Sequence, residues 1–118
     1  IQAHKLSRYG FPALFFSSVL EVAQLYAKHF SKASSKGALY QFNIAKPTVI
    51  VDYNLGVTHS SHFRNLIYHL QRKNHKSVLI KNAYDYPSED LRAFIKSDIL
   101  VVFDFSEIKS YVELPFCC

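Results

Sequence analysis

The stretch TVIVDYNLGVTHSSHFRNLIYHLQRKNHKSVLIK, residues 48–81, decides the fold class of this chain. It begins with residues 48–53, a nearly unbroken run of β-branched and apolar side chains that predicts a strand buried on both faces. Residues 60–73 then carry apolar side chains at helical spacing, after serines that can cap a helix. Residues 77–81 alternate in part and predict a second strand. A strand, a helix and a strand in this order favour an α/β sheet covered by helices.

The segment before this stretch allows more than one structure. Residues 20–30 fit a helix by their apolar spacing, while a strand over 21–28 competes with it on sequence alone. Residues 38–45 predict a short helix, which ends before Pro47 because proline disfavours a helical residue in front of it. The first 20 residues have no clear period and predict an N-terminal arm.

The segment after this stretch predicts a helix, a strand and a tail. Ser88 is a suitable N-cap, and the two carboxylates after it lie where the helix dipole favours anions, so we expect a helix over 88–96. Residues 99–103 are apolar and predict another buried strand. Residues 106–118 have no clear period. The expected division is an arm over 1–20, one domain over 21–105 and an extended tail over 106–118.

The composition is that of one globular domain. Of the 118 residues, 49% are hydrophobic and 19% are charged, which is typical of a folded chain with a modest core. No apolar run reaches the roughly 18 residues that a membrane helix needs. Cys117 and Cys118 form no CxxC motif, so they give no support to dithiol redox chemistry or a zinc site, and they fit a reducing compartment. The chain begins at Ile1 and contains no methionine, which leaves open both a removed targeting peptide and a missing chain end.

The charge is unevenly distributed along the chain. Through Lys81 there are 11 lysines and arginines against two acidic residues, Glu21 and Asp52. From Asn82 onward there are 3 lysines and arginines against 7 acidic residues. The excess of positive charge on the first two thirds indicates a surface for a polyanion, although solvated lysines explain it equally well.

Two basic segments are candidates for binding nucleic acid. Residues 32–37 place hydroxyls, bases and a turn-forming glycine in one loop, whose backbone N–H groups can hold a phosphate. The helix over 60–73 carries Arg64, Tyr68 and Arg72 in one row, and tyrosines such as Tyr68 and Tyr9 can stack on unpaired bases. The candidate RNA-binding residues are Lys28, Lys32, Ser34, Ser35, Lys36, Gly37, Arg64, Arg72, Lys73 and Lys76.

The chain carries no recognisable catalytic or cofactor motif. His59 and His62 stand three apart, but no third ligand follows at a zinc-like spacing. There is no G-x-S-x-G elbow, no G-x-G-x-x-G and no P-loop pattern. Ser34 or Ser35 could serve as a nucleophile, but turn formation and helix capping explain both serines. We therefore expect no enzyme activity, no metal, no cofactor and no small-molecule substrate.

The order of several short motifs resembles a known family. These motifs are the small-Ser-Ser-basic-Gly loop over 33–37, the buried strand over 48–53, the histidine-containing loop and helix over 59–70, the Lys-x-apolar-x-apolar-x-Asn strand over 76–82, and the helix start over 88–96. Together they resemble the thioredoxin-like domain family of a mitochondrial large-subunit ribosomal protein. The family is shared with a small-subunit mitoribosomal protein and an accessory subunit of respiratory complex I.

The resemblance covers residues 21–97 and implies more than the residues alone establish. It implies that 21–28 is a strand, and that the fold is thioredoxin-like, with a mixed sheet of about four strands flanked by helices and extended terminal arms. It implies a structural constituent of the mitochondrial large ribosomal subunit in the matrix, which binds large-subunit rRNA and neighbouring mitoribosomal proteins without membrane insertion. An accessory subunit of complex I on the same fold is the alternative, and a small enzyme with a nucleophilic Ser34 or Ser35 is a third.

Overall fold

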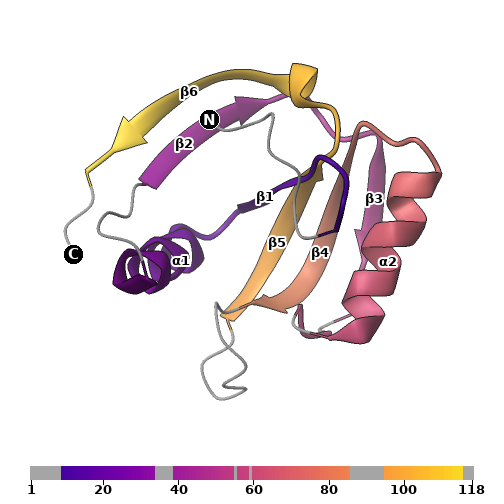
Figure 1. The fold of residues 1–118 in the computed structure, drawn as a ribbon, viewed down its shortest axis with the longest axis horizontal. Coiled ribbons are helices and arrows are strands. Elements are labelled where there is room, and N and C mark those ends of the chain that lie inside the picture. Colours follow the sequence, from indigo (N-terminus) through magenta and orange to yellow (C-terminus); the bar gives the residue numbers. More distant parts are fainter. Residues whose placement is uncertain (1–8, 34–38, 55, 59, 86–94, 116–118) are drawn as a thin grey trace.

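The computed structural model describes residues 9–33, 39–54, 56–58, 60–85 and 95–115, with the backbone alone over 27–33. Short apolar runs form strands, and two longer amphipathic segments form the helices of this part of the chain (Figure 1). In chain order the elements are β1 (Leu14–Ser17), α1 (Leu20–Ala33), β2 (Leu39–Ile44), β3 (Val49–Asp52), α2 (Ser61–Arg72), β4 (Ser77–Asp85), β5 (Ile95–Val102), the short 3₁₀ helix η2 (Phe105–Glu107) and β6 (Ile108–Leu114).

Four strands form one mixed sheet, in the order β1-β5-β4-β3. β3 and β4 are parallel, and α2 connects them, whereas β5 is antiparallel to both β4 and β1. The expected α/β class, with a mixed four-stranded sheet and helices, is therefore confirmed. The strands predicted over 48–53 and from residue 77, and the helix predicted over 60–73, are confirmed to within one or two residues, except that β4 runs on to Asp85.

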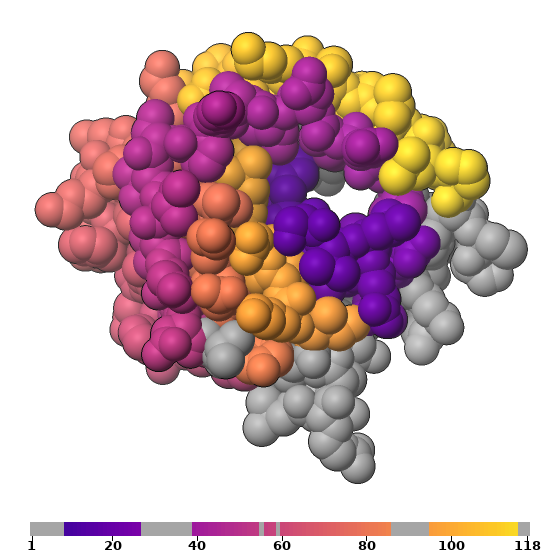
Figure 2. Space-filling view, turned by 180° about the vertical axis from the view of Figure 1, so that it is seen from behind, coloured from indigo at the N-terminus to yellow at the C-terminus, as the bar shows by residue number. Residues whose placement is uncertain are grey.

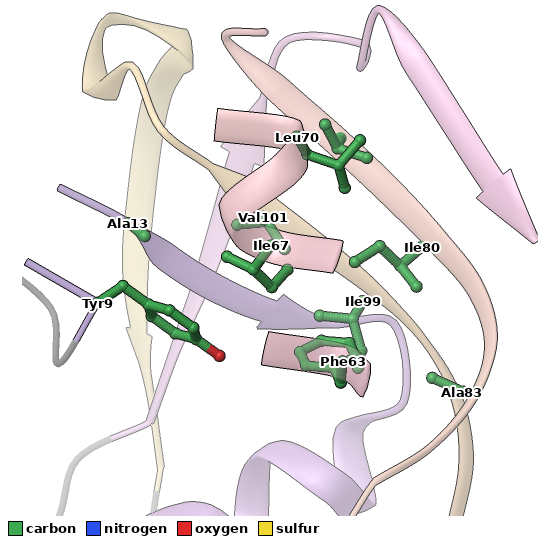
Figure 3. Packing of buried hydrophobic residues seen from close by; sticks show 10 residues of the cluster. Tyr9, Ala13, Phe63, Ile67, Leu70, Ile80, Ala83, Ile99 and Val101 are labelled. Carbon is green, nitrogen blue, oxygen red and sulfur yellow. The ribbon is translucent and has the colours of Figure 1, made fainter. Parts of the chain in front are cut away.

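The main core lies between α2 and one face of this sheet. Side chains alternate along each strand, and the register places Val78, Ile80, Ile99 and Val101 on this face, which we call the α2 face. The apolar stripe of α2 packs onto them, and the buried residues come from several elements (Figure 3). They are Tyr9, Ala13, Phe63, Ile67, Leu70, Val78, Ile80, Ala83, Ile99 and Val101.

A separate two-stranded antiparallel sheet, the ribbon β2–β6, lies on the other side. The chain passes from β5 through η2 into β6 and so crosses from one sheet to the other (Figure 1). Phe42 of the ribbon meets Phe16 of β1 with ring centroids 4.8 Å apart. Phe16 is paired with Leu100, which alternates with Ile99, so Phe16 belongs to the face opposite α2. We call this the ribbon face.

β4 contains a bulge that changes which side chains face the core. Ile80 pairs with Ile99 but Ala83 pairs with Ser97, so β4 has one residue more than β5 over this step. Asn82 takes up the extra residue in the left-handed conformation, with φ 61°, and its N–H donates to Asp98. Ala83 and Asp85 therefore lie on the α2 face, where alternation without the bulge would turn them away.

Three predictions for the flanking segments are wrong. Residues 21–28 belong to helix α1, so the strand that the family resemblance implied is wrong. The helix predicted from the spacing of Val22 and Leu25 is confirmed. The short helix over 38–45 is strand β2, whose Tyr40, Phe42 and Ile44 alternate with polar residues. The extended tail over 106–118 instead forms η2 and β6 over its described part, because β6 finds a hydrogen-bonding partner in β2.

The N-terminal segment, expected to be an arm, contributes to the body of the protein. Leu14–Ser17 is the edge strand β1, and Tyr9 and Ala13 are buried in the main core. The helix expected over 88–96 lies mostly outside the described residues. Its last two positions, Ile95 and Lys96, belong to β5, so a helix that includes them is wrong.

Candidate nucleic-acid interface

Helix α2 is the element that presents the predicted basic residues. Ser60 caps its start: the backbone is extended, and the side-chain oxygen accepts a hydrogen bond from the Phe63 N–H at 3.1 Å. Lys73 caps its end, and Asn74 then turns the chain with φ 62°. His69 and Arg72 occupy the last turn, where the helix dipole favours positive charge. The sequence thus fixes both ends of the helix and its basic C-terminal turn.

The two sides of α2 differ sharply in chemistry. Phe63, Ile67 and Leu70 are buried against the sheet. The helix contains no acidic residue, so its exposed side carries only basic and uncharged groups. The exposed residues of the helix and its C-terminal cap are Ser61, His62, Arg64, Asn65, His69, Arg72 and Lys73. This surface, which we call the basic face of α2, can attract a polyanion without an internal carboxylate to neutralise it.

The guanidinium groups of this face are spaced along the helix axis. Arg64 and Arg72 are eight residues apart, which corresponds to about 12 Å of rise, and they share one row with Tyr68. Both are exposed, and Lys73 follows directly after Arg72. Exposed arginines in such a row can contact successive phosphates of one backbone, which gives affinity without sequence selection.

The two predicted stacking tyrosines belong to a packed aromatic group. Tyr68 is half-buried and meets Tyr9 and Phe11 edge to face, with ring centroids 5.4 and 5.7 Å apart. Tyr9 is 7% exposed, so the expectation that its ring is available to a base is wrong. Its burial comes from the fold of the N-terminal segment over α2, which its local sequence does not encode.

Lys76 is exposed beyond the end of α2, beside an acidic residue. Its backbone carbonyl accepts from the N–H groups of Phe103 and Asp104, at 2.9 and 3.0 Å, which fixes its position at the start of β4. Hydrogen bonds from Ser106 lower the pKa of Asp104, and the charge of Lys76 lowers it further. Part of the Lys76 charge is therefore offset by Asp104, and we rank it below the arginines of α2 as a phosphate contact.

Lys81, another basic residue of the first two thirds, lies away from this face. Its register partner is Asp52 on β3, and both lie on the ribbon face of the sheet. The side chain of Asn82 and the N–H of Asn54 donate to the Asp52 carboxylate and lower its pKa, with smaller contributions from the charges of Lys81 and Lys96. Lys81 therefore lies beside a carboxylate on the face opposite α2 and adds nothing to the basic face of α2.

The structure therefore brings together four of the predicted site residues: Arg64, Arg72, Lys73 and, beyond the helix end, Lys76. The side chains of the other six lie outside what it describes. Ser34, Ser35, Lys36 and Gly37 fall in the undescribed segment 34–38, and only the backbones of Lys28 and Lys32, in α1, are described.

Within the described ranges, no three His, Cys, Asp or Glu side chains form a group that could hold a metal ion. His59, one of the histidines considered above, is not among those residues. Neither of the described helices has the length and apolar character needed to cross a membrane.

Sequence reasoning missed two features of the structure. One is a group of aromatic side chains on the ribbon, formed by Tyr40, Phe42 and Tyr111. Its signal was the alternation of apolar and polar residues from Tyr40 to Ile44. The other is the buried carboxylate of Asp85, which accepts hydrogen bonds from Tyr26 and Thr58. Nothing in the local sequence points to that cluster, because its members come from α1, β4 and the loop after β3.

Comparison of the chain with known protein families, with curated proteins and with solved structures found no match. The function is therefore argued from the residues and their arrangement.

Proposed function

We propose that this chain is a structural constituent of the mitochondrial large ribosomal subunit that contacts rRNA through the basic face of α2. One observation carries the proposal: the exposed side of α2 holds two arginines, a lysine and two histidines, and the helix has no acidic residue. A surface of this kind suits the phosphate backbone of a folded RNA, because most such contacts position the protein rather than read bases.

The thioredoxin-like fold is part of the proposal. The succession β3, α2, β4 within a mixed sheet agrees with the family pattern over 48–82, where the motifs that suggested the family lie. The helix α1, where the family has a strand, departs from that pattern. The fold comparison therefore rests on the central β-α-β segment and on the order of its motifs.

The proposed role needs no reaction and no cofactor. The protein would act in the mitochondrial matrix by holding rRNA and neighbouring mitoribosomal proteins in place. The loop over 32–37 enters the proposal on its sequence alone, as a second phosphate-binding element.

The RNA contact can be tested with the purified chain. Fluorescence anisotropy of a labelled large-subunit rRNA fragment, from about 50 to 200 mM salt, gives the salt slope of binding. The double variant Arg64→Gln/Arg72→Gln should weaken binding and reduce the slope by about two units, because two phosphate contacts are lost. Lys36→Glu should reduce it by about one unit if the loop also touches phosphate. Lys109→Gln, which changes an exposed lysine on the ribbon, is the matched control and should leave the slope unchanged.

The assembly is tested separately by gradient sedimentation of mitochondrial lysates. The protein should travel with large ribosomal subunits and leave them at high salt. Sedimentation with respiratory complexes would instead favour the accessory-subunit function. A salt slope that is the same for the wild type and the double arginine variant would remove α2 as the RNA-binding element.

A further inference from the structure

The ribbon carries a group of aromatic side chains that the main core does not use. Tyr40, Phe42 and Tyr111 lie with ring centroids 5.4 to 6.2 Å apart, and the rings of Tyr40 and Tyr111 meet edge to face. Tyr40 is 42% exposed and Tyr111 is 48% exposed. Both lie on the same face of the ribbon as Phe42, which contacts Phe16 of the four-stranded sheet. Exposed apolar side chains that lie together in one patch, unlike those scattered singly, mark an interaction site.

The rings remain open because the ribbon only partly covers the sheet. Phe42 is the member of the group that reaches the sheet, through Phe16. On the ribbon face, Leu14 and Leu100 are only half-buried and Ile50 is 63% exposed, although Val102 is fully buried. Figure 2 shows an opening through the molecule, bounded by α1, the ribbon and the four-stranded sheet. The aromatic group belongs to the ribbon that forms one wall of this opening.

A carboxylate stands beside the exposed rings. Glu113 is the direct cross-strand partner of Tyr40, on the same face of the ribbon, and is exposed. Side chains paired in this way have Cβ atoms about 4.5–5.5 Å apart. Lys109 is the other ionisable side chain of β2 and β6 apart from the tyrosines. It lies on the same face of β6, two residues from Tyr111 and four residues, or about 13 Å, from Glu113. Among the described residues of the ribbon, the end at Tyr40 therefore has one negative charge and no positive charge.

We propose that Tyr40, Tyr111 and Glu113 form a docking site for a cationic side chain, an arginine or lysine in a basic segment of a neighbouring protein. A guanidinium or ammonium group is attracted to the face of an aromatic ring, and a carboxylate at the rim supplies the opposite charge. A nucleic-acid backbone is disfavoured at the same place, because its phosphates would approach Glu113. The identity of the partner as a ribosomal neighbour rests on the proposed function, whereas the ring-cation contact does not.

The site lies on the opposite side of the four-stranded sheet from the basic face of α2. α2 covers the face that holds Val78 and Ile80, and the ribbon contacts the face that holds Phe16. The two surfaces can be occupied at the same time. One would hold an RNA backbone while the other holds the basic segment of a protein, which is the arrangement needed to connect the two.

The test uses the full chain and two short peptides followed by NMR. The probe is acetyl-Gly-Arg-Gly-Arg-Gly-amide, and its control has citrulline, which is neutral and nearly isosteric, in place of both arginines. The arginine peptide should shift the amide signals of β2 and β6 in a saturable way, and the citrulline peptide should not. Tyr111→Leu and Glu113→Gln should each weaken binding by about two- to fivefold, the size expected of an exposed cation–π or ion-pair contact.

Three matched variants separate this site from a general attraction to acidic residues. Val112→Thr changes the neighbouring side chain on the other face of β6, and Glu107→Gln removes a carboxylate just before that strand. Both should leave the affinity unchanged. Tyr111→Phe keeps the ring and should also bind normally, which shows that a loss in Tyr111→Leu comes from the ring and not from a change in folding.

Several outcomes would overturn the proposal. One is a set of amide shifts near acidic residues throughout the chain and not only in β2 and β6. The others are equal affinity for the arginine and citrulline peptides, and no saturable binding of the arginine peptide to the wild-type chain. If an RNA oligonucleotide instead shifts the amide signals of β2 and β6, the aromatic rings bind nucleic-acid bases and the proposal is wrong. Arg64→Gln/Arg72→Gln should leave peptide binding intact, and Tyr111→Leu should leave RNA binding intact. A negative result with the arginine peptide would therefore leave the RNA proposal unaffected, and a negative result with RNA would leave the peptide proposal unaffected.

Discussion

The hydroxyl of Tyr26 in α1 donates a hydrogen bond of 2.5 Å to Oδ1 of Asp85 at the end of β4. The same oxygen accepts from the hydroxyl of Thr58 at 2.9 Å, and Asp85 is only 6% exposed. Two hydroxyls from distant parts of the chain therefore support one buried carboxylate. This arrangement connects α1 to the end of the four-stranded sheet.

Tyr26→Phe should lower the free energy of unfolding by about 1–2 kcal/mol, because the buried carboxylate of Asp85 loses a hydrogen-bond donor while the ring stays in place. Urea unfolding followed by circular dichroism measures the change. Tyr111→Phe, which removes a hydroxyl from an exposed tyrosine, is the control and should change stability by less than about 0.5 kcal/mol. Equal stability of Tyr26→Phe and the wild type would show that the contact with Asp85 contributes nothing.

Gly56→Ala should destabilise the protein by about 1–3 kcal/mol, because the added methyl group overpacks the site. A Cβ atom at Gly56 would lie 2.4 Å from Cε2 of Tyr53. That ring is held edge to face against Phe63, with centroids 5.4 Å apart, so it cannot move freely. In the Tyr53→Leu background the clash is absent, so the cost of Gly56→Ala should be smaller there. The free energies of unfolding of the wild type, the two single variants and the double variant give the coupling energy between positions 53 and 56. If the effects of the two substitutions simply add, the clash between the new methyl group and the Tyr53 ring is contradicted.

Ser77→Ala should stabilise the protein by about 1 kcal/mol, because it removes a buried hydroxyl that lacks a hydrogen-bond partner among the described residues. Ser97→Ala is the contrasting variant. The Ser97 hydroxyl is also buried but is hydrogen-bonded to the hydroxyl of Ser17 at 2.7 Å, so its removal should destabilise. Thermal unfolding of both variants compares the two cases. A loss of stability in Ser77→Ala would mean that this hydroxyl has a partner after all.

Asp104→Asn should reduce the dependence of stability on acid pH. Hydrogen bonds from Ser106 lower the pKa of Asp104 in the folded protein, so its ionised form favours folding. That contribution is present above the pKa of an unfolded aspartate, about 3.9, and is lost as the pH falls through the lower folded value. Melting temperatures measured between neutral and acid pH should therefore converge for the two proteins at low pH. A difference that stays constant with pH would argue against a role for the charge.

The central segment of the fold could be predicted from sequence because its signals are local. Residues 48–53 are apolar without interruption, and the helix over 60–73 repeats apolar side chains at helical spacing between a capping serine and Asn74. The basic face of α2 followed from the same spacing, since residues opposite the buried stripe must face solvent. Each of these features depends only on residues that are close together in the sequence.

The ribbon could not be predicted in the same way. Tyr40 pairs with Glu113 and Phe42 with Tyr111, about 70 positions along the chain. A strand that depends on such a distant partner has only a weak signal of its own, and residues 38–45 taken alone predict a short helix before Pro47. The burial of Tyr9 was missed for the same reason, since it depends on how the N-terminal segment packs over α2.

The bulge at Asn82 gives β4 a property that matters for any change in its length. One residue in a left-handed turn of the backbone sets the phase of every side chain after it. Deletion of Asn82 would remove the extra residue, so Ala83 would follow Lys81 as in a regular ladder, and Ala83 and Asp85 would stay on the α2 face. Deletion of Tyr84 would instead turn Asp85 to the ribbon face, away from the hydroxyls of Tyr26 and Thr58. Two neighbouring positions of one strand therefore differ sharply in how they accommodate a shortened chain.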